Sequence, residues 1–198
     1  MPHRTRIAHA PSLIAALLLL AAGQAFAQSA QRFSVHASVL RISFSGDGYA
    51  GTGAGVGFEV QGRYRLPFIS VGLGFQLTRH KSFGASENSQ FTGFFIDPRY
   101  VLPVKSTSFG PYLGGRFAIH KQRVNYGPAT LTTSGVAFGP GGGMLFRLNR
   151  RLNLDVGFTY NYASFGTGQV NGKSIAGSKI GSGTSLVARA GLSYGFGR

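Results

Sequence analysis

The segment Leu186-Val-Ala-Arg-Ala-Gly-Leu-Ser-Tyr-Gly-Phe196, near the end of the chain, alternates strictly between two kinds of side chain. Every second residue from Leu186 to Phe196 is apolar, and the residues between them are mostly small or polar. Because successive side chains of a β-strand point to opposite faces, the segment predicts a strand with one apolar face. Its length of about ten residues is what a tilted strand needs to cross the core of a bilayer.

The same two-residue period recurs along the chain and predicts eight strands in all. The other seven cover residues 33–44, 54–64, 69–78, 94–102, 111–120, 136–148 and 152–162. In the first of them the apolar residues change phase near Leu40, which predicts a β-bulge there. After residue 27 the chain has neither a sustained helical period nor an apolar run of about 18 residues, so any membrane crossing is expected to use strands.

The predicted connections alternate in length. Short links are expected at 65–67, 103–110 and 149–151, and long external loops at about 45–53, 79–90, 121–134 and 163–184. Aromatic residues fall at both groups of strand ends: Tyr64, Tyr100, Tyr194 and Phe196 at one, Tyr160 and Tyr162 at the other. Short turns on one side, long loops on the other and two aromatic girdles are typical of a transmembrane barrel.

The N-terminus predicts export. Arg4 and Arg6 precede an apolar run from Leu13 to Ala22, and Ala25-Phe-Ala27 has the small-x-small pattern of a cleavage site. We therefore predict a signal peptide over residues 1–27 and one barrel domain over residues 28–198. The chain has no cysteine, which argues against a lipid anchor and against disulfides.

The formal charge of +15 predicts an anionic partner. Nucleic acid is disfavoured because the signal peptide removes the protein from the cytosol. Three histidines after residue 27 and no cysteine predict no metal site. The glycine-rich stretches 51–57 and 139–143 are not followed by a helix, so they do not predict a phosphate loop, and we expect no cofactor.

A soluble lipocalin-like carrier also alternates, but with its apolar face turned inward. Its outer face would then need solvating charges, whereas the less apolar face here carries mainly Gly, Ser, Thr and Asn. We therefore favour the membrane barrel and keep the soluble periplasmic carrier as an alternative.

The end of the chain resembles the assembly signal of bacterial outer-membrane β-barrels through Gly191, Tyr194 and Phe196, although Gly197 and Arg198 follow the last aromatic residue. Three strand segments, at 97–103, 110–115 and 153–160, also resemble the small eight-stranded outer-membrane barrel family (OmpA/OmpX type). This resemblance implies an all-β, antiparallel, up-and-down barrel in the outer membrane. It also implies a monomer that contacts outer-membrane lipid and is inserted by the outer-membrane assembly machinery.

Charged residues in the strands share the inward phase. A charge facing lipid near the bilayer midplane costs about 2–4 kcal/mol, so the shared phase supports the assignment of the faces. We predict an internal ion network with a structural packing role, in preference to a proton or ion path. Its predicted members are Glu59, Arg63, Asp97, Arg99, Arg116, Arg147, Asp155 and Arg189.

A second set of basic residues is predicted at or beyond the external strand ends: Arg41, Arg79, His80, Lys81, Lys121, Arg123, Lys173 and Lys179. The functional hypothesis is that these groups contact the phosphates of lipopolysaccharide or another polyanion. The alternative is a solvated basic rim without a ligand.

Catalysis has little support in the sequence. His36-Ala-Ser38 has a spacing similar to that of the barrel deacylases, but there the pair faces lipid on a later strand, whereas here it lies inward on the first. We expect no acid to orient His36, place His120 at the rim, and predict no enzyme activity. The predicted role is structural or surface-interactive, with a narrow porin-like channel and a lipid A-modifying enzyme as further alternatives.

Overall fold

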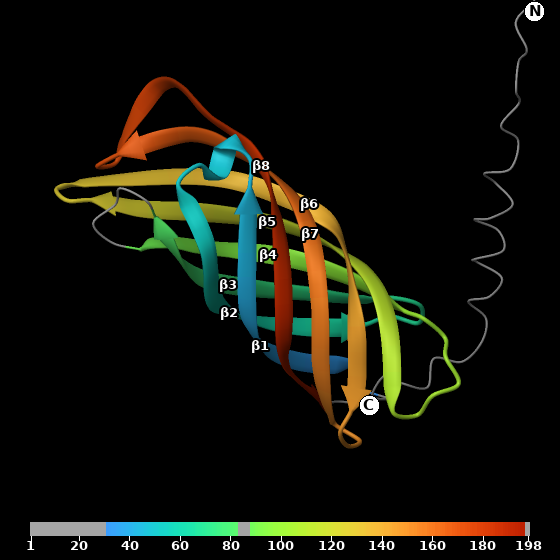
Figure 1. Cartoon of the computed structure of the whole chain (residues 1–198). Coiled ribbons are helices and arrows are strands. Elements are labelled where there is room, and N and C mark those ends of the chain that lie inside the picture. Colours follow the sequence, from blue (N-terminus) through green and yellow to red (C-terminus); the bar gives the residue numbers. More distant parts are fainter. Residues whose placement is uncertain (1–30, 83–87, 197–198) are drawn as a thin grey trace, which may run out of the picture.

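Eight antiparallel strands close into a barrel in the computed structural model, which describes residues 31–82 and 88–196, without the side chains of residues 167 and 176–180 (Figure 1). Each strand pairs with its neighbours in sequence, and β8 closes the sheet on β1. The strands are β1 (Phe33–Ser45), β2 (Thr52–Arg65), β3 (Ser70–Ser82), β4 (Ser89–Val101), β5 (Phe109–Tyr126), β6 (Ala129–Arg147), β7 (Leu152–Val170) and β8 (Lys173–Phe196). The predicted signal peptide, 1–27, lies outside the described residues.

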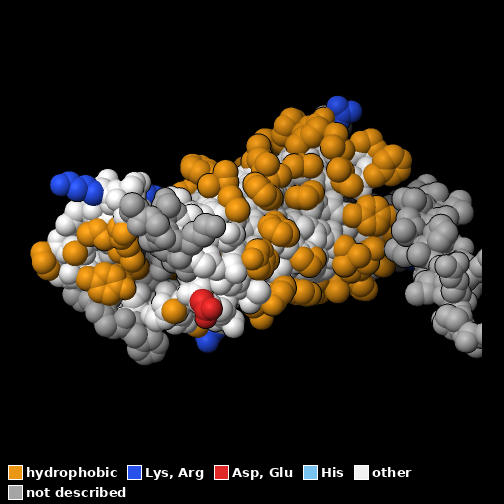
Figure 2. Space-filling model, turned by 90° about the horizontal axis from the view of Figure 1, so that it is seen from above, with side chains coloured by type: hydrophobic (Ala, Val, Ile, Leu, Met, Phe, Trp, Pro, Cys, Tyr) orange, Lys and Arg blue, Asp and Glu red, His pale blue; other side chains and the backbone are white. Residues whose placement is uncertain are grey.

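The two predicted faces are confirmed. Outward side chains include Leu73 and Phe94, which are 62% and 70% exposed, whereas the inward Glu59 and Asp155 are at most 1% exposed. Figure 2 shows hydrophobic side chains over most of the right half of the molecule and fewer of them in the left half, where Lys or Arg atoms lie at the upper left. An apolar outer wall excludes the lipocalin-like alternative, whose apolar face would line the interior.

The predicted bulge near Leu40 is wrong. The pairing of β1 with both neighbours runs through Leu40 without a register shift, and inward positions continue from His36 to Ile42. The apolar residues change face because the interior itself changes: Leu40 and Ile42 pack against Val187 inside the barrel, and Arg41 points outward.

Two of the predicted long loops are instead extensions of the strands. β5 and β6 continue to a turn at residues 127–128, and β7 and β8 continue to Asn171 and Gly172. Both of these turn residues have positive φ, 50° and 81°, as a two-residue type I′ hairpin requires. The dipeptide Asn-Gly is the strongest short sequence signal for a hairpin, so the turn between β7 and β8 is encoded locally in the sequence. The hairpins project beyond β1–β4 at the left of Figure 1.

We call the end where β1 begins and β8 ends the termini end, and the opposite end the hairpin end. Between β1 and β2 the short 3-10 helix η2 (Asp47–Tyr49) turns the buried Tyr49 into the hairpin end. There the Tyr49 ring stacks on the Phe44 ring, with 3.9 Å between the ring centres, and packs edge-on against the Phe165 ring, with 4.9 Å between the centres. At the termini end, Phe33 contacts Tyr64 on the outer wall at 4.9 Å. Among the described residues, no helix is long and apolar enough to span a membrane.

Candidate functional site

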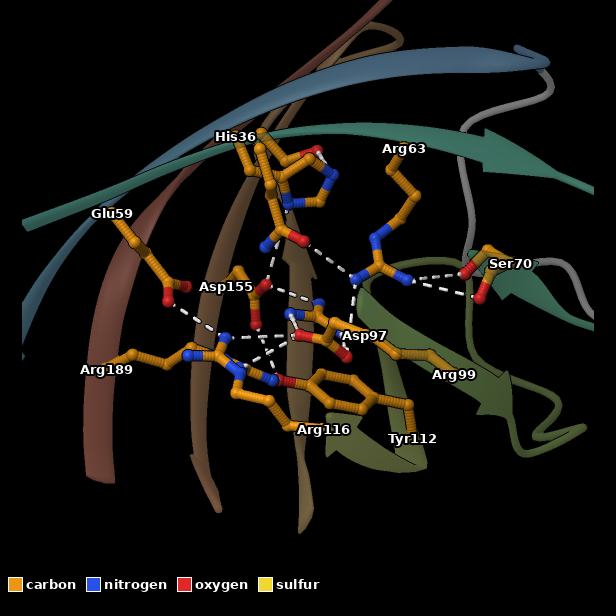
Figure 3. A network of polar contacts seen from close by, with 12 residues as sticks. His36, Glu59, Arg63, Ser70, Asp97, Arg99, Tyr112, Arg116, Asp155 and Arg189 are labelled. Atoms are coloured by element: carbon orange, nitrogen blue, oxygen red, sulfur yellow. Dashed lines mark hydrogen bonds and ion pairs between the residues drawn. The ribbon is translucent and has the colours of Figure 1, made fainter. Parts of the chain in front are cut away.

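Asp97, on β4, lies at the centre of a buried ion network inside the barrel (Figure 3). Its Oδ2 accepts hydrogen bonds from Arg189 at 3.1 Å, Arg99 at 3.2 Å and Arg116 at 3.3 Å. Arg63 approaches the other carboxylate oxygen at 3.5 Å. These arginines come from β2, β4, β5 and β8, so one carboxylate connects strands from around the barrel wall.

Asp155, on β7, forms the second centre of the network. Its Oδ2 accepts a hydrogen bond from Arg99 at 2.5 Å, and its Oδ1 accepts one from the hydroxyl of Tyr112 at 2.7 Å. The same hydroxyl accepts a hydrogen bond from Arg189 at 3.2 Å, and the Arg99 guanidinium lies 4.4 Å from the centre of the Tyr112 ring. The phenol therefore links both acidic centres.

Glu59 is the third buried acid among the described residues, and it pairs with Arg116 at 2.8 Å. That guanidinium also lies 3.9 Å from the centre of the Phe95 ring and donates to Gln76 at 3.2 Å. Seven of the eight residues predicted for this network therefore meet. The eighth, Arg147, is half-buried at the end of β6, where its charge and that of Arg65 repel each other.

Tyr112 was missed by the sequence prediction, and two glycines make its position available. A Cβ on Gly143 or on Gly157 would lie only 2.4 Å or 2.2 Å from the Tyr112 hydroxyl oxygen. The inward phase of Tyr112 in β5 was visible in the sequence, but the space opposite it depends on β6 and β7.

The expectation that no acid would orient His36 is wrong. Its Nδ1 lies 3.6 Å from Asp155, and its Nε2 lies 2.9 Å from the Ser34 hydroxyl and 3.0 Å from the Ser193 hydroxyl. The acid comes from β7, which becomes a near neighbour only when β8 closes on β1. The cavity beside this group has a volume of about 30 Å³, enough for about one water molecule, and this geometry favours packing over the turnover of an acyl substrate.

His80 and His120 were predicted at the rim, and both instead point into the barrel, where they are 1% and 6% exposed. The His80 ring stacks on Phe44 at 4.6 Å, and its Nε2 lies 2.9 Å from the Thr78 hydroxyl. His120 packs beside Phe165 at 5.2 Å. Within residues 31–82 and 88–196, no group of three or more potential ligands is placed to hold a metal ion.

The predicted external cations occupy the outer wall near the hairpin end and the hairpins themselves. Six of them have exposed side chains: Arg41, Arg79, Lys81, Lys121, Arg123 and Lys173. The side chain of the seventh, Lys179, lies outside those that the structure describes. Three of the arginines lie in one row that crosses strands β1 to β5. The paired residues of this row are, in strand order, Arg41, Val56, Arg79, Gln90 and Arg123. Strands are about 4.8 Å apart, so Arg79 and Arg123 project from backbones about 10 Å apart.

A cleft of about 480 Å³ lies beside two of these cations, Lys121 and Arg123. Its other walls are polar and uncharged, from β4, β6 and the β7–β8 turn: Gln90, Thr92, Thr130, Thr132, Asn171 and Gly172. The Asn171 side chain accepts a hydrogen bond from the backbone N–H of Thr130 at 2.8 Å, which holds the turn against β6. The cleft thus combines two cations with hydroxyl and amide groups.

The residues of the predicted assembly signal lie on β8. Tyr194 and Phe196 face outward and are about half exposed, and Phe196 stacks on Phe33 at 6.2 Å. Gly191 faces β1, where a Cβ would lie 2.2 Å from the carbonyl oxygen of Ala37.

The chain matches the model of a known protein family. A family model described as outer membrane protein beta-barrel domain matches residues 13–196. No curated protein matches the chain.

Several solved structures of bacterial proteins have a similar fold. Neisserial surface protein A is 23% identical, with a TM-score of 0.60, over 83% of this chain and 97% of its own. Ail, the attachment invasion locus protein of Yersinia pestis, is 17% identical, with a TM-score of 0.55, over 84% of this chain and 99% of its own. Ail has also been solved in complex with the heparin analogue sucrose octasulfate, and that structure too has a TM-score of 0.55 to this chain. At these identities the likeness concerns the fold.

Proposed function

Since the chain belongs to the outer membrane protein beta-barrel domain family, and is therefore an outer-membrane barrel, we propose that it binds anionic glycolipid, in particular lipopolysaccharide, through the cations at its hairpin end. The barrel supplies a rigid wall, and the cations supply the contacts. The role is interactive rather than enzymatic.

The observation that carries this proposal is the position of the cations relative to the apolar wall. On β5 the outward residues Phe117 and Ile119 are followed on the same face by Lys121 and Arg123. On β3 the outward Leu77 is followed in the same way by Arg79 and Lys81. Cations directly beyond a lipid-facing band lie at the depth of membrane headgroups, where phosphate oxygens form strong charge-assisted hydrogen bonds with Lys and Arg.

The excess of positive charge supports the same conclusion. The whole chain has only five acidic residues, and Glu59, Asp97 and Asp155 are buried among arginines. The external cations therefore have few acids to neutralise them, and a polyanion would be attracted over about a Debye length. The Ail complex supports the chemistry in a weaker way, because a barrel of similar fold takes a sulfated ligand.

Binding of purified lipopolysaccharide to the barrel in phosphatidylcholine nanodiscs tests the proposal. In one variant, Arg79, Lys81, Lys121 and Arg123 are all replaced by serine. We expect at least a tenfold loss of affinity and a weaker dependence of binding on salt. The control variant replaces the exposed Lys105 and Arg150, which lie in connections at the termini end, by serine. It should bind like the wild type.

Two results would contradict the proposal. One is unchanged affinity in the fourfold variant. The other is an equal loss in the control variant, because binding would then follow total charge rather than the cations at the hairpin end.

A further inference from the structure

The outer wall formed by β4 and β5 is amphipathic along its length. Two apolar cross-strand pairs face outward, Ile96 with Phe117 and Phe94 with Ile119. Toward the hairpin end the next outward pair is Thr92 with Lys121, and then Gln90 with Arg123. The wall thus changes from apolar to cationic within one step of two residues, about 7 Å along the strands.

Each half of this wall is hollowed. The apolar half holds a groove of about 550 Å³, with Leu73, Phe75, Phe94, Ile96, Phe117 and Ile119 among its lining residues. The cationic half holds the cleft of about 480 Å³ beside Lys121 and Arg123. Phe94 and Ile119 border the groove, and their next outward neighbours, Thr92 and Lys121, border the cleft. The two hollows therefore adjoin along the same pair of strands.

We propose that this wall is a specific site for one phosphorylated, acylated glycolipid of the lipid A type, with an acyl chain in the groove and a phosphate in the cleft. The inference rests on the proposed function and deepens it by assigning a site and a ligand class. A sulfated or phosphorylated polysaccharide would leave the groove unused, whereas an amphiphile matches both halves at once.

The residues of the site divide the recognition between them. Lys121 and Arg123 face the phosphate, because a long lysine or arginine stem can cover apolar surface while its charged group reaches the headgroup. Thr92, Gln90 and Thr132 offer hydroxyl and amide groups suited to sugar hydroxyls. Arg79, opposite Gln90, lies where a second phosphate of the same headgroup can reach it. The groove holds the acyl chain by shape, since lipid competes for any apolar surface in a bilayer.

Native mass spectrometry of the purified barrel tests the site, with bound lipid A counted per barrel. A calorimetric titration with deacylated, phosphorylated lipid A oligosaccharide measures the headgroup alone. Ile96→Trp, with Leu73→Trp as a second variant, fills the groove without touching a cation. Val39→Trp places the same bulk on the outward face of β1, three strands away from β4 around the barrel, and is the control. A shift in gel mobility on heating checks that each variant is folded.

We expect the wild type and Val39→Trp to retain one lipid A molecule, and Ile96→Trp to retain at least tenfold less. The groove variant should still bind the oligosaccharide like the wild type, whereas Lys121→Ser with Arg123→Ser should lose both ligands.

If Ile96→Trp retains lipid A as Val39→Trp does, while the cation variant loses it, the site is wrong and the proposed function stands. The same mass spectrometry experiment is repeated with phosphatidylglycerol in place of lipid A. Equal retention of the two lipids would overturn the glycolipid assignment. If no variant changes the binding of either probe, both proposals are wrong.

Discussion

Asp97 shows how a single residue organises the interior of the barrel. Four guanidinium groups lie within 3.5 Å of its carboxylate, and the side chain is almost fully buried. A buried charge is costly unless it is paired, so removal of one partner is far more damaging than loss of an exposed ion pair. With Asp155 and Glu59, this residue balances most of the positive charge inside the barrel.

We therefore expect Asp97→Asn to lower the free energy of unfolding by about 3–5 kcal/mol, because four arginines would face each other without the central anion. Urea unfolding of the barrel in lipid vesicles measures the change. Asp47→Asn is the matched control at an exposed acid and should stay within about 0.5 kcal/mol of the wild type. Equal stability of the two variants would show that the network contributes nothing.

A second prediction concerns the space that glycine leaves for Tyr112. Gly157→Ala should destabilise the barrel by about 1–3 kcal/mol, because the new methyl group would displace the Tyr112 hydroxyl from Asp155 and Arg189. Gly62→Ala is the control, since a Cβ there meets no atom within 4 Å. In a Tyr112→Phe background, which lacks the hydroxyl, Gly157→Ala should cost less stability than in the wild type. If the effects of the two substitutions on the free energy of unfolding simply add, this explanation is refuted.

At the scale of the elements, the hairpin end combines long hairpins with a short helix that covers the interior. η2 places Tyr49 above Phe44, and a second layer formed by Phe91, His80 and His120 lies around them. Burial raises the pKa of the Tyr49 hydroxyl, and its hydrogen bond to Ser185 offsets this only in part. The ring is therefore held neutral inside the aromatic cluster.

The raised pKa of Tyr49 predicts a specific loss of stability in alkali. In the unfolded chain a tyrosine ionises near pH 10, whereas folded Tyr49 keeps its proton, so above about pH 10 proton loss favours the unfolded state. Between pH 8 and 12 the free energy of unfolding should therefore fall more steeply with pH for the wild type than for Tyr49→Phe. Parallel curves would mean that Tyr49 ionises as freely in the fold as outside it.

For the whole molecule, two layers of side chains cross the lumen of a barrel with only eight strands. The ion network fills the middle, and the aromatic cluster around Tyr49 fills the hairpin end. A barrel of this size has an interior just wide enough for its own side chains. This arrangement favours a wall-mediated role over transport.

Planar bilayer recordings test that conclusion. We expect the reconstituted barrel to give no stable open-channel current, and Tyr49→Ala to behave in the same way because the ion network remains. A steady cation- or anion-selective current from the wild type would support the narrow channel instead.

Several features could be derived from the sequence because they depend on local periodicity. The number of strands, their two faces and the inward phase of Glu59, Asp97 and Asp155 follow from a period of two. The continuous register at Leu40 could not be derived in this way. The apolar residues of β1 face outward near its start and inward from Leu40 on, because at that level the interior is itself apolar. The extended β7–β8 hairpin is different, because the Asn-Gly turn at Asn171 and Gly172 is itself a local signal in the sequence.

By itself, the sequence determined that this protein is a barrel with an apolar outer wall and a charged interior, because alternation along a strand is a property of neighbouring residues. Only the tertiary structure decided which charges meet: Asp97 with arginines from four strands, and His36 with Asp155. It also placed Thr92 beside Lys121, where groove and cleft adjoin. The physical reason is that register and closure set every distance between strands, and no local pattern encodes them.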